Sequence, residues 1–385
     1  MASMSLAACG GGMDFGELFS DSGQPARSGQ QAQPQPPAKP GAGTPRVVLL
    51  LPLSASGQVG AIARAMKKSA ELAMIDAGNP GITLVTKDTR GTAGGAQMAA
   101  QAAISEGARL ILGPFLASSV KAVKPVASSA GVPVIAFSSQ SSTAGGGVYL
   151  MSFLPEEEVD NVVRHAVKSG KRNIAAFIPR TAYGSVVARA LYESAKRHGA
   201  SIAAEERYVA TATGISAPAA RMAAKIASPA NKIDALFFPG SPNMVGAAGK
   251  VFAAGGVTAS SVQLLGTGQW DSAAIRTKPL AIGGWYAGVA PSLVRYFSNH
   301  YSKTYGSTPP RIASLAYDAT SLAIALGRGG GFSHSAIADS EGYQGMNGLF
   351  RFRPNGRIQR GLSILQVTET GPQVVAPAPT RFSGS

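Results

Sequence analysis

The segment "RVVLLLPLSASGQVG" (residues 46–60) decides the fold. Its apolar run ends at Pro52, which is typical of a strand buried on both faces of a parallel sheet. Small residues from Ser54 to Gly57 then form a turn. A helix is predicted after the turn, because apolar residues recur three or four positions apart as far as Met74. The segment is therefore a strand, a turn and a helix in succession.

The same alternation continues in two series separated by a break. Short apolar runs follow one another with helical patterns between them, which predicts parallel sheets covered by helices on both faces. The break falls at "GGGVYLMSFLPEEE" (145–158), where Pro155 and an acidic helix start indicate a crossover between two lobes. Near the end, Asn355-Gly356 lies between apolar runs and predicts a β-hairpin. The sequence therefore predicts an α/β protein with two parallel sheets.

Composition excludes several classes of function. The chain of 385 residues has a formal charge of +15, but its Lys and Arg residues are scattered and not interleaved with aromatic residues, so we expect no nucleic-acid partner. No apolar run is long enough to cross a membrane, and the single cysteine cannot form a disulfide within the chain. The four histidines lack metal-ligand spacing, and no catalytic constellation is complete. We expect no metal, no cofactor and no enzymatic activity.

Polar loops follow the predicted strands at equivalent places. Ligands bind beyond the carboxyl ends of the strands in open parallel sheets, and several of these loops open a helix, whose free N–H groups attract anions. Ordinary helix capping also accounts for any single serine. As a set, the loops predict a ligand site between the lobes; they are 52–57, 113–119, 137–143, 179–184, 239–243 and 266–271.

The order of these pieces resembles the type I periplasmic binding proteins of the leucine/isoleucine/valine-binding family. The matching pieces, which lie between residues 46 and 370, include "LILGPFLASSV", "GVPVIAFSS", "YGSVVARAL" and "LLGTGQWD". The resemblance implies two Rossmann-like lobes joined by three crossovers, as in a Venus flytrap. It places 46–152 plus 285–340 in lobe 1, 153–284 plus 341–370 in lobe 2 with a returning hairpin, and a flexible tail at 371–385.

The resemblance also implies a set of ligand-binding residues. The family serine that touches the ligand carboxylate falls at Ala117, and the family tyrosine of the "AYG" piece falls at Tyr183. The acidic position that would hold an ammonium falls at Gly268 or Gln269, which carry no charge; Asp271 is an alternative that requires a loop shift. The candidate ligand-binding residues are Ser54, Ala117, Ser118, Ser138, Ser139, Gln140, Tyr183, Ser241 and Gln269.

The resemblance leaves more than one function open. The first is a solute-binding lipoprotein that delivers a small polar ligand, amino-acid-like or amide-like, to a membrane permease of the ABC type. The second is a penicillin-binding protein activator, a related envelope lipoprotein that contacts peptidoglycan synthases and binds no small solute. The third is a receptor-like sensor domain. The missing acid speaks against a free amino acid, because an enclosed ammonium without a counter-charge costs several kcal/mol.

The start of the chain predicts its attachment to a membrane. "LAAC" ending at Cys9 resembles a lipobox, the cleavage and lipid-attachment site of bacterial lipoproteins, so residues 1–9 are interpreted as the remnant of a signal peptide. We expect that the natural chain starts further upstream or was shortened here. Residues 10–45 are rich in Pro, Gly and Gln and predict a disordered tether. These features predict a periplasmic protein held at the membrane by a lipid alone.

Overall fold

The structure, a computed structural model, describes residues 43–382. The lipobox with Cys9 and nearly all of the predicted tether lie outside these residues. Two parallel sheets form the centre of the fold, as the alternation of strands and helices predicts, so the α/β fold class is confirmed. No helix among the described residues is long and apolar enough to cross a bilayer.

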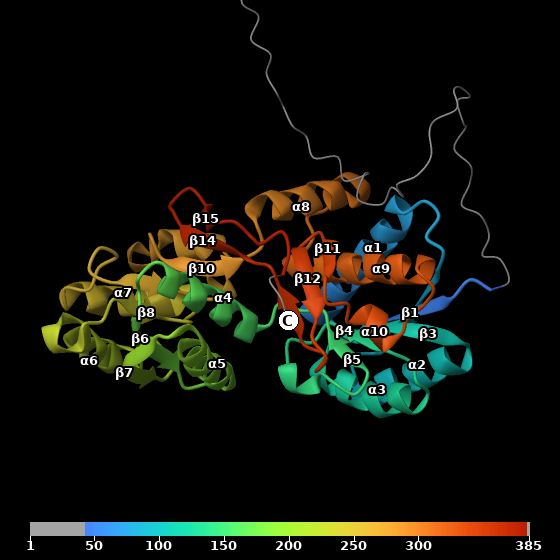
Figure 1. Cartoon of the computed structure of the whole chain (residues 1–385), viewed down its shortest axis with the longest axis horizontal. Helices are drawn as coiled ribbons and strands as arrows, with labels where there is room; N and C mark the ends of the chain where they lie inside the picture. Colours follow the sequence, from blue (N-terminus) through green and yellow to red (C-terminus); the bar gives the residue numbers. More distant parts are fainter. Residues whose placement is uncertain (1–42, 383–385) are drawn as a thin grey trace, which may run out of the picture. The chain divides into compact units, whose positions relative to one another are not determined.

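The first sheet has five parallel strands in the order β2-β1-β3-β4-β5. Its interior strand β1, which pairs with β2 and β3, has five consecutive buried residues, which explains the unbroken apolar run. Helices cover both faces, with α1 and α9 packed together on one side and α2 and α3 on the other (Figure 1). The strands are β1 (Arg46–Leu51), β2 (Thr83–Asp88), β3 (Ala108–Leu112), β4 (Val134–Ala136) and β5 (Val148–Leu150). The helices are α1 (Gly57–Asp76), α2 (Ala93–Ser105), α3 (Ala117–Ser129), α8 (Pro291–Tyr305), α9 (Ser314–Arg328) and α10 (His334–Ile337).

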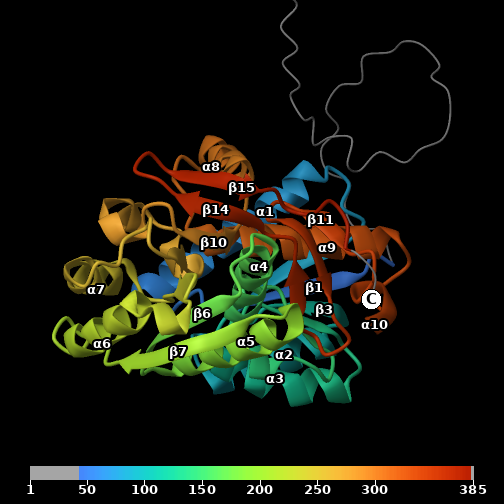
Figure 2. The same cartoon turned by 60° about the vertical axis from the view of Figure 1, so that its left-hand side comes forward.

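The second sheet has seven strands in the order β15-β14-β10-β9-β8-β6-β7, and only β14 and β15 run antiparallel to their neighbours. Separate apolar clusters lie on its two faces, one under α4 and α5 and the other under α6 and α7. Figure 2 shows β7 beside α5, and β15 and β14 next to β10. The strands are β6 (Asn173–Pro179), β7 (Ser201–Tyr208), β8 (Ala235–Phe237), β9 (Gln263–Leu265), β10 (Trp285–Gly288), β14 (Ser363–Val367) and β15 (Pro372–Ala376). The helices are α4 (Pro155–Lys168), α5 (Ala182–His198), α6 (Ser216–Ala227) and α7 (Pro242–Ala254).

The chain passes between the two sheets three times, in agreement with the two-lobe fold that the resemblance implies. It passes from β5 to α4, from β10 to α8, and from the small sheet β11-β12-β13 to β14. Short 3-10 helices lie in the connections: η2 (Ser141–Thr143), η3 (Pro229–Asn231), η4 (Gly268–Trp270), η5 (Ala273–Thr277), η6 (Pro279–Ala281) and η7 (Arg311–Ala313).

The structure moves three of the expected lobe boundaries. Residues 285–288 were expected in lobe 1, but they form β10 and pair with β9 and β14 in the second sheet. The hairpin at Asn355-Gly356 is present as β12 (Gly348–Phe352) and β13 (Ile358–Arg360), with β11 (Tyr343–Gly345) beside β12. It was expected in lobe 2, yet its apolar side chains belong to the core of the first sheet. Part of the expected flexible tail is β15, which extends the second sheet.

A buried carboxylate holds the small sheet to helix α9. Asp318 accepts hydrogen bonds from the Met346 and Asn347 backbone N–H groups at 2.6 and 3.3 Å, and from the Asn347 side-chain amide at 2.8 Å. Asn347 in turn accepts a hydrogen bond from the Ser314 hydroxyl at 3.0 Å. Burial raises the pKa of Asp318, while the charge of Arg360 and these hydrogen bonds oppose that rise. This network fixes the turn between β11 and β12, within the small sheet from which the chain later makes its third passage between the lobes.

We expect Asp318→Ala to lower the free energy of unfolding by about 3 kcal/mol, because it leaves several buried donors without an acceptor. Urea unfolding followed by circular dichroism measures this change. Glu369→Ala, at an exposed acid outside the network, is the control and should change stability by less than about 0.5 kcal/mol. Equal losses in the two variants would show that the network does not stabilise the fold.

Candidate functional site

The strand-end loops place two of the predicted residues of lobe 2 in one cluster. Tyr183 is the second residue of α5, and its hydroxyl lies 2.7 Å from the hydroxyl of Thr267, which follows β9. Gln269, in η4, also forms a side-chain hydrogen bond with Tyr183. Burial raises the pKa of Tyr183, and the nearby charge of Glu158 raises it further. The phenol is therefore a neutral hydrogen-bonding group at this edge of the sheet.

The predicted residues of lobe 1 lie in three separate loops. Ser138 is buried and its hydroxyl accepts the Gln140 N–H at 3.1 Å, while the side-chain amide of Gln140 donates to Ser142 at 3.0 Å. Ser139 and Gln140 are exposed. Ala117 begins α3, with exposed Ser118 beside it. The exposed Ser54 belongs to a different arrangement, because its N–H points to Asp88 at 3.4 Å.

Ser241 precedes α7 and is half-buried. Its neighbour Gly240 accepts a hydrogen bond from the indole N–H of Trp270 at 3.1 Å, so the loops after β8 and β9 touch. Ser241 and the Tyr183 cluster thus belong to adjoining loops of one sheet. No hydrogen bond among the described residues joins Ser241 to Tyr183 or Gln269.

An acid from another element lies beside the loop after β9, where the sequence has none at residues 268 and 269. Glu158, in the first turn of α4, is buried and accepts the Gly268 backbone N–H at 2.9 Å. A Cβ atom added to Gly268 would lie 2.3 Å from Oε1 of Glu158. The Glu158 carboxylate therefore fills the space that a side chain of residue 268 would need. It stands at the position where the family resemblance placed the ligand's counter-charge.

Burial raises the pKa of Glu158, and the charges of Asp271 and Glu156 act in the same direction. The charge of Arg311 and the Gly268 N–H oppose the rise. Arg311 precedes α9 in lobe 1 and forms an ion pair with Asp271 in lobe 2, with 2.8 Å between Nη1 and Oδ2. Its guanidinium also lies over the ring of Phe153, 4.5 Å from the centroid. Arg311 therefore bridges the two lobes directly.

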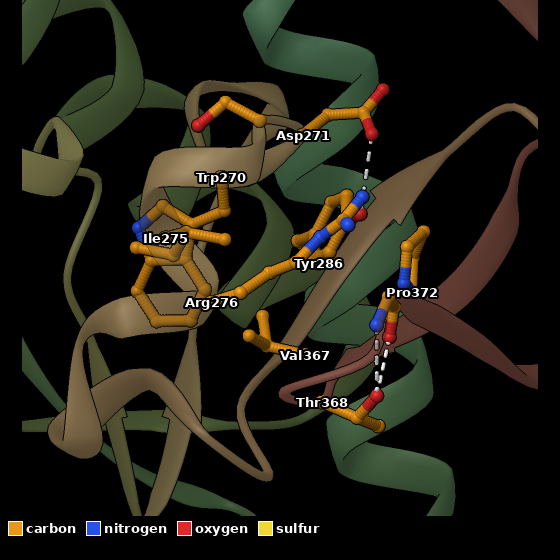
Figure 3. Close-up of a pocket in the computed structure, with 10 residues that line it drawn as sticks. Trp270, Asp271, Ile275, Arg276, Tyr286, Val367, Thr368 and Pro372 are labelled. Atoms are coloured by element: carbon orange, nitrogen blue, oxygen red, sulfur yellow. Dashed lines mark hydrogen bonds between the residues drawn. The ribbon is translucent and has the colours of Figure 1, made fainter.

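Asp271 also has a hydrogen-bond partner within lobe 2. Figure 3 shows the hydroxyl of Tyr286 pointing to Asp271, and this hydrogen bond measures 3.3 Å. Burial raises the pKa of Tyr286 and the charge of Asp271 adds to that effect. Asp271 is thus committed to Arg311 and Tyr286. The role of the missing acid, which the sequence left open for Asp271, stays a prediction.

Neither Glu158 nor Arg311 was among the residues predicted from the sequence. The "PEEE" segment was interpreted only as the acidic start of a helix, which is the common role of such residues. Their spacing was a usable signal, because consecutive residues of a helix point about 100° apart, so the three acids face different surroundings. Arg311 follows two prolines and carried no motif.

Comparison with known proteins identifies the family. A family model described as a periplasmic binding protein matches residues 44–372. The chain belongs to the periplasmic binding protein family. Members of this type I family are solute-binding proteins, and membership implies a periplasmic location. Comparison with curated protein sequences gave no match.

Solved structures share this periplasmic binding protein fold at low sequence identity. A protein from Rhodospirillum rubrum assigned as a branched-chain amino acid ABC transporter has a TM-score of 0.73 and 19% identity, and the match covers 86% of this chain and 100% of that one. The C-domain of LpoA from Haemophilus influenzae, a regulator of PBP1A, has a TM-score of 0.68 and 17% identity over 86% and 100% of the chains. LivJ from Streptococcus pneumoniae, in complex with isoleucine, has a TM-score of 0.57 and 19% identity over 87% and 100%. These likenesses show the fold alone.

A second acid in the first turn of α4, Glu157, makes the stability of the protein depend on pH. Glu157 is buried and pairs with Arg353 of the β12–β13 turn, with 3.1 Å between Nη2 and Oε1. Burial raises its pKa to about 7, against the attraction of Arg353. The folded protein therefore keeps a proton on Glu157 at pH values where the unfolded chain has lost it.

The free energy of unfolding should consequently fall as the pH rises. The contribution of Glu157 is fully present below the unfolded pKa of 4.5 and is lost as the pH passes the folded value of about 7. Across this window we expect a fall on the order of 2 kcal/mol. Urea unfolding at intervals from pH 5 to 7.5 measures it. Glu157→Gln should reduce the dependence of the free energy of unfolding on pH, and Glu369→Gln should leave it unchanged. The same pH dependence in Glu157→Gln and the wild type would contradict the raised pKa of Glu157.

Proposed function

We propose that this periplasmic binding protein is a non-enzymatic solute receptor for ABC-type import, which holds a small amino-acid-like ligand between its lobes. The observation that carries the proposal is the buried carboxylate of Glu158 at the position of the Gly268 side chain. The sequence argued against an ammonium ligand because residues 268 and 269 carry no charge. Glu158 removes that objection, because it supplies an acid to the same place from α4.

The groups around Glu158 suit a ligand that carries both an ammonium and a carboxylate. Asp271 forms the direct ion pair with Arg311, whereas Glu158 has no ion pair of its own among the described residues and is the acid available to a ligand ammonium. Tyr183, Thr267 and Gln269 offer hydroxyl and amide groups beside it. The loops with Ser118, Ser138 and Ser139 offer hydroxyls and backbone N–H groups, which suit a carboxylate. An ammonium close to Glu158 would also favour the charged form of that acid.

A ligand screen tests this proposal. In a thermal shift assay against amino acids, short peptides and amides, a bound ligand should raise the melting temperature by several degrees, since it stabilises the folded protein by RT ln(1 + [L]/Kd). Glu158→Gln keeps an acceptor for the Gly268 N–H but removes the charge. It should weaken binding of an ammonium ligand at least about a hundredfold.

Glu193→Gln, an exposed acid on α5, is the matched control and should bind like the wild type. No shift across the whole library would contradict the transport proposal. Equal affinity of Glu158→Gln and the wild type would contradict the assigned role of Glu158 while leaving solute binding standing.

A second candidate function has its own supporting observation. The ion pair between Arg311 and Asp271 joins the lobes with side chains of the chain itself, so the lobes need no solute to be held together. A protein of this kind suits the role of a penicillin-binding protein activator, in which a synthase is the partner. A lipid on Cys9 and a tether at 10–45 would let either kind of protein reach its membrane partner.

The activator function has a direct test. The purified protein should retain a penicillin-binding protein in a pull-down and raise its transpeptidase rate on mixing. Arg311→Gln should reduce that effect, because it breaks the bridge between the lobes, and Arg189→Gln on the exposed face of α5 should not. A synthase whose retention and rate are unchanged by the protein would exclude this function.

A further inference from the structure

A cavity lies on lobe 2 between α7 and the segment that contains η5 and η6, and none of the candidate ligand-binding residues lines it. Its volume is about 600 Å³, within the range of small-molecule sites in proteins. Figure 1 shows α7 on the outer side of the second sheet, so the cavity is built on a surface helix.

Apolar groups form most of its lining. Ala253, Ala259 and Pro279 are exposed apolar residues of the lining, whereas Val245, Val257 and Leu280 are almost completely buried. Two glycines of α7, which have no side chains, leave space between this helix and the opposite wall of the cavity. A Cβ atom on Gly246 would lie 3.1 Å from Cδ of Lys278, and one on Gly249 would lie 3.5 Å from Cβ of Leu280. The two glycines thus keep the cavity open along one side of the helix.

The only charged residues in the lining are two lysines, Lys250 and Lys278. Neither forms an ion pair within residues 43–382, and no acidic side chain lines the cavity. The hydrocarbon stem of Lys278 lies close to Gly246, so its ammonium belongs to the cavity wall on the side of α7. An unpaired ammonium beside an apolar cavity attracts a molecule with a negative head and a hydrocarbon body.

We propose that this cavity binds a free, single-chain anionic amphiphile, such as an unbranched long-chain carboxylate. The hydrocarbon tail lies against Ala253, Ala259 and Pro279, whose apolar surface is exposed in the cavity and is favourable to bury. The carboxylate head lies between the ammonium groups of Lys250 and Lys278. This site is separate from the one between the lobes, so it does not depend on the function proposed there.

Isothermal titration calorimetry with dodecanoate, kept below the concentration at which it self-associates, tests the proposal. We expect one dodecanoate per protein. Dodecyltrimethylammonium, which has the same tail and the opposite charge, should bind at least tenfold more weakly, and acetate should not bind. Equal affinity for the two dodecyl compounds would overturn the assigned role of the lysines.

Two variants locate the site on the molecule. Lys250→Gln with Lys278→Gln removes both charges and should weaken dodecanoate binding at least tenfold, whereas Lys168→Gln with Lys196→Gln, at exposed lysines elsewhere, should change it less than twofold. Gly249→Leu fills the cavity and should abolish binding. Gly94→Leu, at an exposed helical glycine of α2 with open space around it, is its control. Unchanged binding in both cavity variants would refute the site.

A membrane surface is another source of anionic amphiphiles. A second experiment distinguishes binding to a membrane from binding of a free molecule. Flotation with phosphatidylglycerol vesicles measures binding to a lipid surface. Vesicle binding that depends on Lys250 and Lys278, without any binding of monomeric dodecanoate, would overturn the proposal of a free ligand. Circular dichroism melting curves confirm that each variant is folded before its binding is measured.

Discussion

The close approach of the Glu158 carboxylate to the backbone of Gly268 constrains the region between the lobes. A buried acid is costly unless hydrogen bonds or charges compensate it, and here the Gly268 N–H and the charge of Arg311 do so. Any side chain at position 268 would collide with the carboxylate. The loop after β9 and the start of α4 therefore depend on each other. Glu158 needs the space that the glycine leaves and the N–H that it donates.

Two acids, Asp271 and Glu158, compete for the positive charge of Arg311. Asp271 and Glu158 both lie near Arg311, but Asp271 forms the direct ion pair and accepts a hydrogen bond from Tyr286. Arg311 comes from lobe 1 and Asp271 from lobe 2, so the pair links the lobes while Glu158 stays within lobe 2. A solute receptor and a partner-binding activator differ in which of these two acids matters. The first function depends on Glu158, the second on the bridge of Arg311 to Asp271.

Much of the fold could be predicted from local patterns, whereas the centre of the site could not. The apolar run of β1 and the helical period after it identify a buried strand and its helix, and Asn355-Gly356 identifies the hairpin. The hairpin was placed in lobe 2 by the family resemblance, and this was wrong, because a local turn signal carries no information on which core its apolar face will meet. Glu158 was missed for the same reason, since it acts 110 residues away from the glycine that it contacts.

Analysis of any small molecule that copurifies with the protein tests the role of Glu158 most directly. The protein is purified from its native periplasm without added ligand and denatured, and the released compound is treated with an amine-specific reagent before mass spectrometry. The account predicts a compound with a primary or secondary amine, released by the wild-type protein and absent from Glu158→Gln. Release of a compound without an amine, or equal release by both proteins, would contradict it.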